Sequence, residues 1–391
     1  MKQKIIAFLL LFCAAPAFAD FKTKAKSAFL IDYDSGAEIV SIAADELMPP
    51  SSMLKLMTLT VLFDEIKAGR VSLNDRFPVG KNADYQNPLW YPASKICLSA
   101  GQDISVRDLI LGLIVLSGGD ASVVVAEKLG ETEEKFTDLM TAKARSIGMP
   151  LSTFGNASGL PNDKNLMTSR ELATLAYHII SDYPDLYPMF ATKRFEFGEY
   201  KTDWCRDWGK THTVNYNKLL FIMSGADGLK TGHTDKGGYG MVASAASGGR
   251  RLIGVINGFH GKGHDALASE MKNLLFHGFS TTTTKVFYRP GDNVTAVPVW
   301  YGRDDTVMTT VDKTFAITVP KESGLSGVRV LARYTDPMPA PIHAGDVVGE
   351  IIAERDGNVV TRTNLIAKSD VGRVRFLARA WRNIVTMLMG R

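Results

Sequence analysis

The chain has 391 residues, of which 45% are hydrophobic and 22% are charged, and its formal net charge is +4 at pH 7. This composition excludes a disordered or fibrous protein, and the length favours two globular domains over one. Five arginines and no acidic residue lie between residues 371 and 391, so the remainder carries no basic excess and we expect no nucleic-acid partner.

The first residues predict a secretion signal. Two lysines precede an apolar run from Ile5 to Ala15, and Ala17-Phe18-Ala19 provides a cleavage site with small residues at its two key positions. The run is shorter than the ~20 residues that a membrane span needs, although an N-terminal anchor is the alternative interpretation. We therefore expect a signal peptide at 1–19 and export of the rest.

Cys97 and Cys205 are the two cysteines that follow the predicted signal. In an exported protein they can form one disulfide, but two cysteines do not define a disulfide framework. Two unpaired thiols fit the sequence equally well, so it leaves their state open.

Predicted strands bracket a helical region in the first 280 residues. Residues 28–41 predict two strands joined at Asp34-Ser35-Gly36, and residues 239–259 predict two buried strands around a glycine-rich turn. Helical spacing dominates between them, at 53–66, 106–129 and 169–180. This order predicts an α+β domain whose sheet joins N-terminal and later strands.

The character of the sequence changes near residue 280. Short apolar segments such as 315–320, 328–334 and 347–360 are separated by Pro, Gly and Asp turns, which indicates a region of short strands. We therefore expect one domain at 20–280 and a small β-rich domain at 281–368.

The C-terminal segment 371–391 predicts a basic amphipathic helix. At 100° per residue its apolar side chains fall on one side, and Arg375, Arg379 and Arg382 fall on the other. Such a helix suits a membrane interface, because its apolar face enters the acyl boundary while arginines meet anionic headgroups. A helix packed on its own domain is the alternative.

A serine and a lysine share one helix face within "PPSSMLKLMTLTVLFDEI", residues 49–66. Ser52 and Lys55 are three residues apart and therefore point the same way. A desolvated lysine can lose its proton near pH 7 and then activate a serine hydroxyl, so Ser52 is a candidate nucleophile and Lys55 its base. Because Ser-x-x-Lys occurs about once by chance in a chain this long, a snorkelling Lys55 is the alternative.

Two further segments favour this chemistry. "DGLKTGHTDKGGYGMVASA" contains Lys230-Thr231-Gly232, the only Lys-Thr-Gly of the chain, directly before a predicted strand. Its glycine lets a ligand lie along the strand edge, and its lysine and threonine can hold a carboxylate. "LSGGDAS", residues 116–122, offers a second serine, Ser117, at a helical junction.

In this order the segments resemble the Ser-x-x-Lys, Ser-x-Asn and Lys-Thr-Gly motifs of penicillin-binding proteins and serine β-lactamases. "PPSSMLKLMT", "NASGLP", "NYNKLL" and "DGLKTGHT" are similar to the low-molecular-mass D-alanyl-D-alanine carboxypeptidases, and the similarity covers nearly the whole chain. The resemblance implies an antiparallel sheet with helices on both faces, then a β-rich domain and a C-terminal anchor helix. It also implies a peripheral position on the periplasmic face of the inner membrane.

The same resemblance implies a mechanism without cofactor or metal. Ser52 would attack the bond between two terminal D-alanines of a peptidoglycan stem peptide, or a β-lactam, with Lys55 as base and Ser117 as proton relay. Backbone N–H groups of Ser52 and His233 would hold the oxyanion. Lys230 would also help to keep Lys55 neutral, and the implied substrate-binding set is Lys230, Thr231, Gly232 and His233.

Two positions depart from the family pattern. Gly119 stands where Ser-x-Asn has its asparagine, and Tyr216 stands where relatives often have arginine. An asparagine at 119 would contact the substrate and the active-site lysine. We therefore expect Gly119→Asn to raise acylation at least several-fold with folding unchanged, unless Asp120 or Tyr216 already compensates.

Alternatives stay open on the same scaffold: a DD-endopeptidase, a weak β-lactamase, or a catalytically impaired cell-wall scaffold protein. His260 and His264 are spaced like two metal ligands, but no further cluster supports them, so we interpret both as surface-loop residues. Asp120 and Asp227 fit helix or turn caps as well as catalytic groups.

Overall fold

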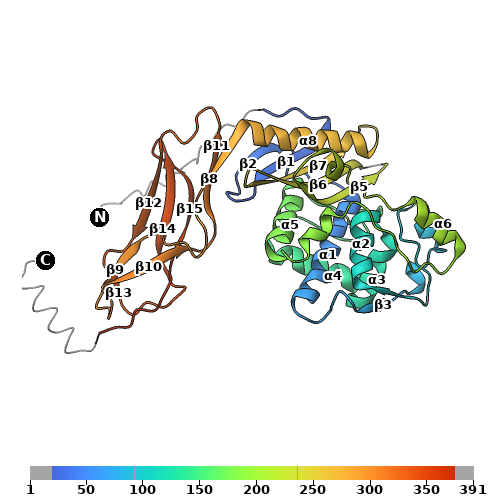
Figure 1. Cartoon of the computed structure of the whole chain (residues 1–391), viewed down its shortest axis with the longest axis horizontal. Coiled ribbons are helices and arrows are strands. Elements are labelled where there is room, and N and C mark those ends of the chain that lie inside the picture. The colour runs from blue at the N-terminus through green and yellow to red at the C-terminus, as the bar shows by residue number, and fades with distance from the viewer. Residues whose placement is uncertain (1–19, 92, 236, 375–391) are drawn as a thin grey trace, which may run out of the picture. The chain divides into compact units, whose positions relative to one another are not determined.

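The computed structural model describes residues 20–91, 93–235 and 237–374. They divide into two compact units, 20–280 and 281–374, each of which is described by itself (Figure 1). The predicted signal peptide and the segment from residue 375 onward lie outside the described residues.

The first unit is built on a five-stranded antiparallel sheet. Its first and last strands lie far apart in the sequence but side by side in the sheet, as predicted. The strand order is β2 (Glu38–Ile42), β1 (Ala25–Asp32), β7 (Arg250–Phe259), β6 (Gly238–Ser247) and β5 (Ala226–Thr234).

Helices cover both faces of this sheet, which is the predicted fold class. Alternate residues of β7 enter opposite cores, because side chains alternate along a strand: Leu252 and Ile256 pack in one apolar cluster, and Ile253 and Val255 pack in the other. One face carries α8 (Gly263–Thr281) (Figure 1). The other face carries α1 (Lys55–Lys67), α2 (Val106–Leu111), α3 (Gly119–Gly130), α4 (Glu133–Ser146) and α5 (Ser169–Asp182).

Short elements complete this unit around the helices. They are β3 (Arg76–Pro78), β4 (Asp103–Ser105), α6 (Asp203–Thr211), α7 (Leu219–Ile222), the 3-10 turns η1 (Ser51–Leu54), η2 (Lys81–Ala83), η3 (Pro88–Trp90) and η5 (Tyr187–Ala191), and the π-helical turn η4 (Gly112–Leu116).

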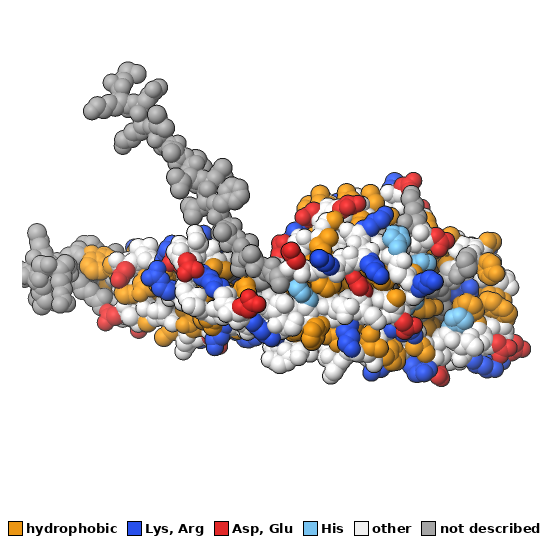
Figure 2. Space-filling model, turned by 90° about the horizontal axis from the view of Figure 1, so that it is seen from above, with side chains coloured by type: hydrophobic (Ala, Val, Ile, Leu, Met, Phe, Trp, Pro, Cys, Tyr) orange, Lys and Arg blue, Asp and Glu red, His pale blue; other side chains and the backbone are white. Residues whose placement is uncertain are grey.

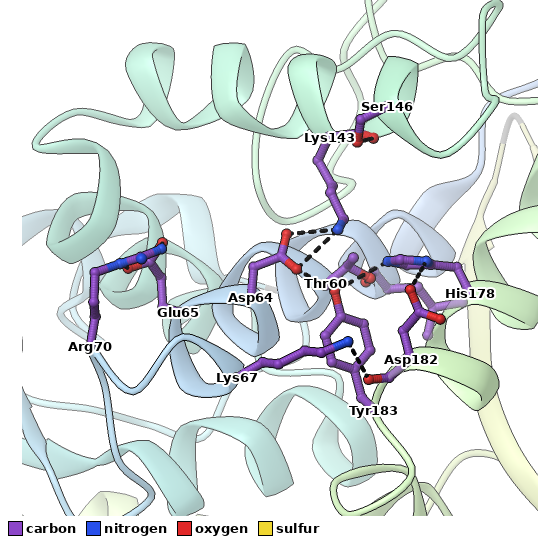
Figure 3. Close-up of polar contacts among 11 residues, drawn as sticks. Thr60, Asp64, Glu65, Lys67, Arg70, Lys143, Ser146, His178, Asp182 and Tyr183 are labelled. Atoms are coloured by element: carbon purple, nitrogen blue, oxygen red, sulfur yellow. Dashed lines mark hydrogen bonds and ion pairs between the residues drawn. The ribbon is translucent and has the colours of Figure 1, made fainter. Parts of the chain in front are cut away.

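A polar cluster fixes the C-terminal half of α1 (Figure 3). Asp64 accepts hydrogen bonds from Lys143 of α4 at 3.0 Å and from the hydroxyl of Tyr183 at 2.6 Å. His178 of α5 lies 3.2 Å from the same hydroxyl and 2.9 Å from Asp182. The cluster therefore joins α1 to α4 and to α5.

Cys97 and Cys205 form a disulfide, which answers the question that the sequence left open. The bond ties α6 to the segment before β4 across a sequence separation of 108. In the chain-entropy description, closing a loop of about 100 residues stabilises the folded state by up to about 4–5 kcal/mol.

The second unit is a β structure with its own apolar core of mainly Val, Ile and Ala residues. The pair β8 (Thr282–Tyr288) and β11 (Phe315–Pro320) is antiparallel. The larger sheet has the order β12 (Val328–Tyr334), β14 (Val347–Arg355), β15 (Asn358–Ala367), β10 (Thr306–Val311), β9 (Ala296–Trp300) and β13 (Met338–Pro339).

The start of the predicted C-terminal helix is extended in the structure. Val371 pairs with Ile342 and Arg373 pairs with Gly302, so the described part of this segment belongs to the β-rich unit. The rest of the predicted helix lies outside the described residues. None of the helices in the described part of the chain is long and apolar enough to cross a membrane.

Charged side chains of both signs are interspersed on the face that Figure 2 shows. On each unit, taken by itself, Lys and Arg side chains lie among Asp and Glu side chains.

Candidate active site

The structure brings Ser52 and Lys55 together at the start of α1. Ser52 lies in the turn η1, and Lys55 is the first residue of the α-helix that continues it. Lys55 Nζ is 3.0 Å from Ser52 Oγ and donates a second hydrogen bond to the carbonyl of Ser158. Only 2% of Lys55 is exposed, so the amine is held against the hydroxyl instead of reaching solvent.

Burial lowers the pKa of Lys55 from its ordinary value to about 7, while the carboxyl of Asp120 opposes the shift. At pH 7 roughly half of such amines are neutral, whereas an ordinary lysine with a pKa of ~10.4 is neutral in roughly one molecule in 2,500. A neutral amine at hydrogen-bond distance can accept the proton of the serine hydroxyl. The snorkelling alternative is therefore wrong for this lysine.

Lys230 is the second buried lysine of the site. It is 1% exposed, and its ammonium donates to the carbonyl of Thr231 at 3.0 Å. Burial first, and the charge of Lys55 second, lower its pKa. For Lys55 the causes are burial and the opposing charge of Asp120, and Lys230, which the resemblance implied would keep Lys55 neutral, is not among them. An incoming carboxylate would favour the charged form of Lys230, which leaves Lys55 as the neutral member of the pair.

Gly232 lets strand β5 run beside Ser52. A Cβ at this position would lie 2.9 Å from the carbonyl oxygen of Pro50 and 3.0 Å from the backbone nitrogen of Ser52. Any larger residue would push β5 away from η1. The glycine of Lys-Thr-Gly therefore sets the distance between the strand edge and Ser52.

A cleft of about 400 Å³ lies over these residues, and we call it the catalytic cleft. Ser94, Tyr216 and His264 line it together with six of the seven predicted site residues, Ser52, Lys55, Ser117, Thr231, Gly232 and His233. The seventh, Lys230, is buried on β5 beside Thr231.

Ser117 follows the turn η4 in a left-handed backbone conformation, with φ 58° and ψ 31°. The residue is 5% exposed, and α3 begins two residues later. A non-glycine residue in this region of backbone space is uncommon and often marks a functional site. The tight junction holds the Ser117 side chain in the lining of the catalytic cleft.

Asp120 and Asp227 have structural partners. Asp120 is fully buried and accepts backbone hydrogen bonds from Ile96, Cys97 and Leu98, which fix that segment to the start of α3. Burial raises its pKa, and these hydrogen bonds oppose the shift. Asp227 binds Arg251 at 2.7 Å. Neither carboxylate lines the catalytic cleft.

Trp90 occupies the space that the asparagine of Ser-x-Asn would need. A Cβ on Gly119 would lie 2.5 Å from Cζ3 of Trp90. The indole is fully buried, and its N–H donates to the carbonyl of Asn82 at 3.0 Å, so it cannot swing aside freely. This contact contradicts our expectation that an asparagine at 119 leaves folding unchanged.

His264 is a cleft residue that the sequence interpretation assigned wrongly to a surface loop. It lies in the first turn of α8, with its ring 5.2 Å from that of Tyr216 and 5.3 Å from that of Tyr239. Its Nδ1 is buried and has no hydrogen-bond partner among the described residues. Burial, with Lys230 as the next cause, lowers its pKa to about 4. No sequence signal separates His264 from His260, because their difference arises from where α8 begins.

A metal site is not formed by the described residues. Within the ranges that the structure describes, no group of three or more His, Cys, Asp and Glu residues could hold an ion. A serine at hydrogen-bond distance from a buried lysine with a pKa lowered to about 7 is the arrangement of a serine enzyme that acts through acyl intermediates.

Comparison with known protein families identifies the family of this chain. The family model described as D-alanyl-D-alanine carboxypeptidase matches residues 14–260, and that of the penicillin-binding protein 5 C-terminal domain matches residues 282–373. The chain therefore belongs to the D-alanyl-D-alanine carboxypeptidase family of low-molecular-mass penicillin-binding proteins.

Individual members of the family are similar to this chain over nearly its full length. The D-alanyl-D-alanine carboxypeptidase DacC of Escherichia coli is 32% identical over 96% of this chain and 92% of its own. DacA of Haemophilus influenzae is 31% identical, with 98% of both chains covered. The crystal structure of penicillin-binding protein 5 from Haemophilus influenzae is similar with a TM-score of 0.80 and 30% identity, covering 91% of this chain and all of that one.

Gly119→Ala should destabilise the protein, because overpacking against Trp90 typically costs about 1–3 kcal/mol. Gly198→Ala is the matched control, since a Cβ there meets no atom within 4 Å. Urea unfolding of both variants measures the difference, and in a Trp90→Leu background the further cost of Gly119→Ala should be smaller than in the wild type. Equal stability of the two single variants would contradict the contact.

The pKa of Lys55 predicts how acylation depends on pH. Since the amine acts only when neutral, kcat/KM for acylation should rise with pH through about 7 and level off near pH 8. Stopped-flow acylation by one β-lactam from pH 5.5 to 8.5 measures this limb. A rate that does not change between pH 6 and 8 would exclude Lys55 as the base.

Proposed function

We propose that this serine-type D-alanyl-D-alanine carboxypeptidase removes the terminal D-alanine of peptidoglycan stem peptides through an acyl-enzyme on Ser52. The observation that carries the proposal is the buried pair in which Lys55 Nζ lies 3.0 Å from Ser52 Oγ. The lowered pKa of Lys55 supplies a base at neutral pH without a histidine or a metal.

Acylation requires that a proton be taken from Ser52 and that a proton be given to the leaving amine. Lys55 takes the proton of Ser52 as Oγ attacks the carbonyl carbon, and Ser117 passes a proton to the leaving amine. Backbone N–H groups of Ser52 and His233 are the candidates for the oxyanion site, a role that typically accounts for 10²–10³ in rate. The close approach of Gly232 to Ser52 supports this assignment, because His233 follows directly on β5.

Recognition of the terminal carboxylate falls to one end of the cleft. Thr231 and His233 line the cleft there, and Lys230, buried on the same strand, is the candidate for the positive charge once a carboxylate binds. We add His264 to this set, because its buried Nδ1 has no hydrogen-bond partner among the described residues and a ligand could provide one. Tyr216, at the position where relatives often have arginine, contributes a hydroxyl and a ring in place of a cation.

Hydrolysis follows when water attacks the ester on Ser52. A β-lactam would acylate the same hydroxyl, and its acyl-enzyme would persist where water attack is slow. The cleft does not support the alternative of a scaffold protein without activity. Burying the ammonium of Lys55 costs several kcal/mol, and a scaffold protein would gain nothing from that cost. The buried base favours a working enzyme even though Gly119 replaces the motif asparagine.

Ser52→Ala should abolish covalent labelling by a penicillin and leave the fold unchanged, because one small hydroxyl contributes little to packing. The neighbouring Ser51→Ala is the control and should still be labelled. Mass spectrometry of the labelled protein locates the adduct, and release of D-alanine from a pentapeptide measures turnover. Labelling of the Ser52→Ala variant would exclude the assignment of the nucleophile.

We also propose that the protein acts after export, on the periplasmic face of the inner membrane, held there by a C-terminal amphipathic helix. The arginine-bearing face of residues 375–391 supports binding to anionic headgroups.

Ending the chain after Val374 should release the protein from vesicles that contain anionic lipid and leave D-alanine release intact. The cut spares Val371, which is buried in the β-rich unit. Vesicle sedimentation measures the bound fraction. If the shortened protein still sediments with vesicles, the attachment lies elsewhere.

A further inference from the structure

A second cavity, which we call the side pocket, adjoins the catalytic cleft. Its volume is about 630 Å³, within the range of ligand pockets. Five residues line both spaces: Gly159, Leu160, Pro161, Thr234 and Asp235. The segments 159–161 and 234–235 are therefore common walls, and a ligand that lies along β5 in the cleft passes the side pocket.

The lining of the side pocket combines apolar walls with negative charge. Its apolar residues are Pro49, Pro50, Leu160, Pro161 and Leu166. The exposed carboxylates of Asp163 and Asp235 also line it, and none of its described lining residues is basic. Neither carboxylate forms an ion pair with another described residue. This lining suits an aliphatic side chain that ends in an ammonium group, because the stem packs on apolar surface while the charged end meets the carboxylates.

Hydrogen bonds hold the walls of the side pocket in place. The buried amide of Asn165 donates to the carbonyl of Leu160 at 3.0 Å and to Oδ1 of Asn156 at 3.1 Å. The hydroxyls of Ser51 and Thr234 lie 3.2 Å apart and join the turn η1 to β5. A prearranged wall lowers the entropy lost when a ligand binds.

The position of the side pocket indicates which part of a substrate it meets. Gly232 lies level with Ser52, because a Cβ on this glycine would be 3.0 Å from the backbone nitrogen of Ser52. In the proposed mechanism the terminal carboxylate lies at Thr231, before Gly232 on β5, whereas Thr234 follows Gly232 and lines the side pocket. An extended chain advances about 3.3 Å per residue, so the residue that precedes the two D-alanines comes next to the side pocket.

We propose that the side pocket binds a cationic side chain on the residue directly before the two D-alanines, with its ammonium at Asp163 and Asp235. The protein then trims stem peptides whose side-chain amine is free in preference to those in which this amine is acylated. This inference rests on the proposed function. Acylation of the amine removes its positive charge, so removal of D-alanine by this protein precedes any reaction that joins the amine to a second peptide.

Three peptides test the recognition of the charge. Each is acetylated at its N-terminus and ends in D-Ala-D-Ala, and the residue before these two is lysine, Nε-acetyl-lysine or norleucine. Norleucine keeps the aliphatic stem without the amine, whereas Nε-acetyl-lysine keeps the nitrogen without the charge. The kcat/KM for D-alanine release should be roughly tenfold higher for the lysine peptide than for either of the others, since each exposed carboxylate typically contributes a factor of about 3.

Asp163→Asn and Asp185→Asn form a matched pair of variants. Both aspartates are exposed, and of the two only Asp163 lines the side pocket. Asp163→Asn should lower the ratio of kcat/KM for the lysine peptide over the norleucine peptide about threefold, and Asp185→Asn should leave this ratio unchanged. Asp235→Asn is a second variant and should lower the same ratio by a similar factor.

The dependence on salt gives an independent measurement of the same attraction. Raising the ionic strength from about 0.01 M to about 1 M shortens the Debye length from about 30 Å to about 3 Å. Because both carboxylates are exposed, the ratio of kcat/KM for the lysine peptide over the norleucine peptide should fall towards one in the wild type. A ratio that does not respond to salt would contradict recognition by these carboxylates.

The outcomes separate this inference from the proposed function. No release of D-alanine from any of the three peptides would overturn the carboxypeptidase mechanism itself. Release of D-alanine with equal kcat/KM for the three peptides, or equal ratios in the Asp163→Asn and Asp185→Asn variants, would overturn only the role of the side pocket.

Discussion

The burial of one amine, that of Lys55, is the constraint on which the rest of the site depends. Removing an ammonium from water is costly, and a protein lowers the cost by letting the group lose its proton. Here the amine sits on the first turn of α1 with the hydroxyl of Ser52 and the carbonyl of Ser158 as its hydrogen-bond partners. The same burial that makes the lysine expensive as a cation makes it useful as a base.

The surrounding fold keeps that amine in place from three directions. The polar cluster around Asp64 anchors the far end of α1 to α4 and α5 (Figure 3). Gly232 allows β5 to approach the near end. Asp120 fixes the segment at Ile96 to the start of α3, next to Ser117. If α1, β5 or the start of α3 shifted, the residues it carries would move relative to those on the other two elements.

Local patterns predicted the parts of the site that depend on local geometry. Ser52 and Lys55 meet because residues three apart share a helix face, and Gly232 could be expected beside a ligand because strands use glycine at close approaches. The sheet could be predicted from runs of apolar residues. The contact of Trp90 with Gly119, the disulfide and the cleft position of His264 join residues far apart in sequence, so no spacing rule reveals them. The expectation that an asparagine at Gly119 leaves folding unchanged was wrong for this reason: it considered a missing amide and not the ring that fills its place.

The contact between Trp90 and Gly119 also restricts the order in which this site can change. A side chain at position 119 is excluded while the indole is present, and loss of the indole alone would leave a cavity of the kind that costs about 3–5 kcal/mol. A change at Gly119 alone or at Trp90 alone therefore gives a less stable protein. A protein in which both positions change together need not be less stable. The stabilising disulfide between Cys97 and Cys205 supplies a reserve from which such an intermediate could be tolerated. Gly119 and Trp90 are therefore coupled: a change at one position is tolerated only when the other changes too. The residue that this motif position can hold depends on a tryptophan that lies outside the motif.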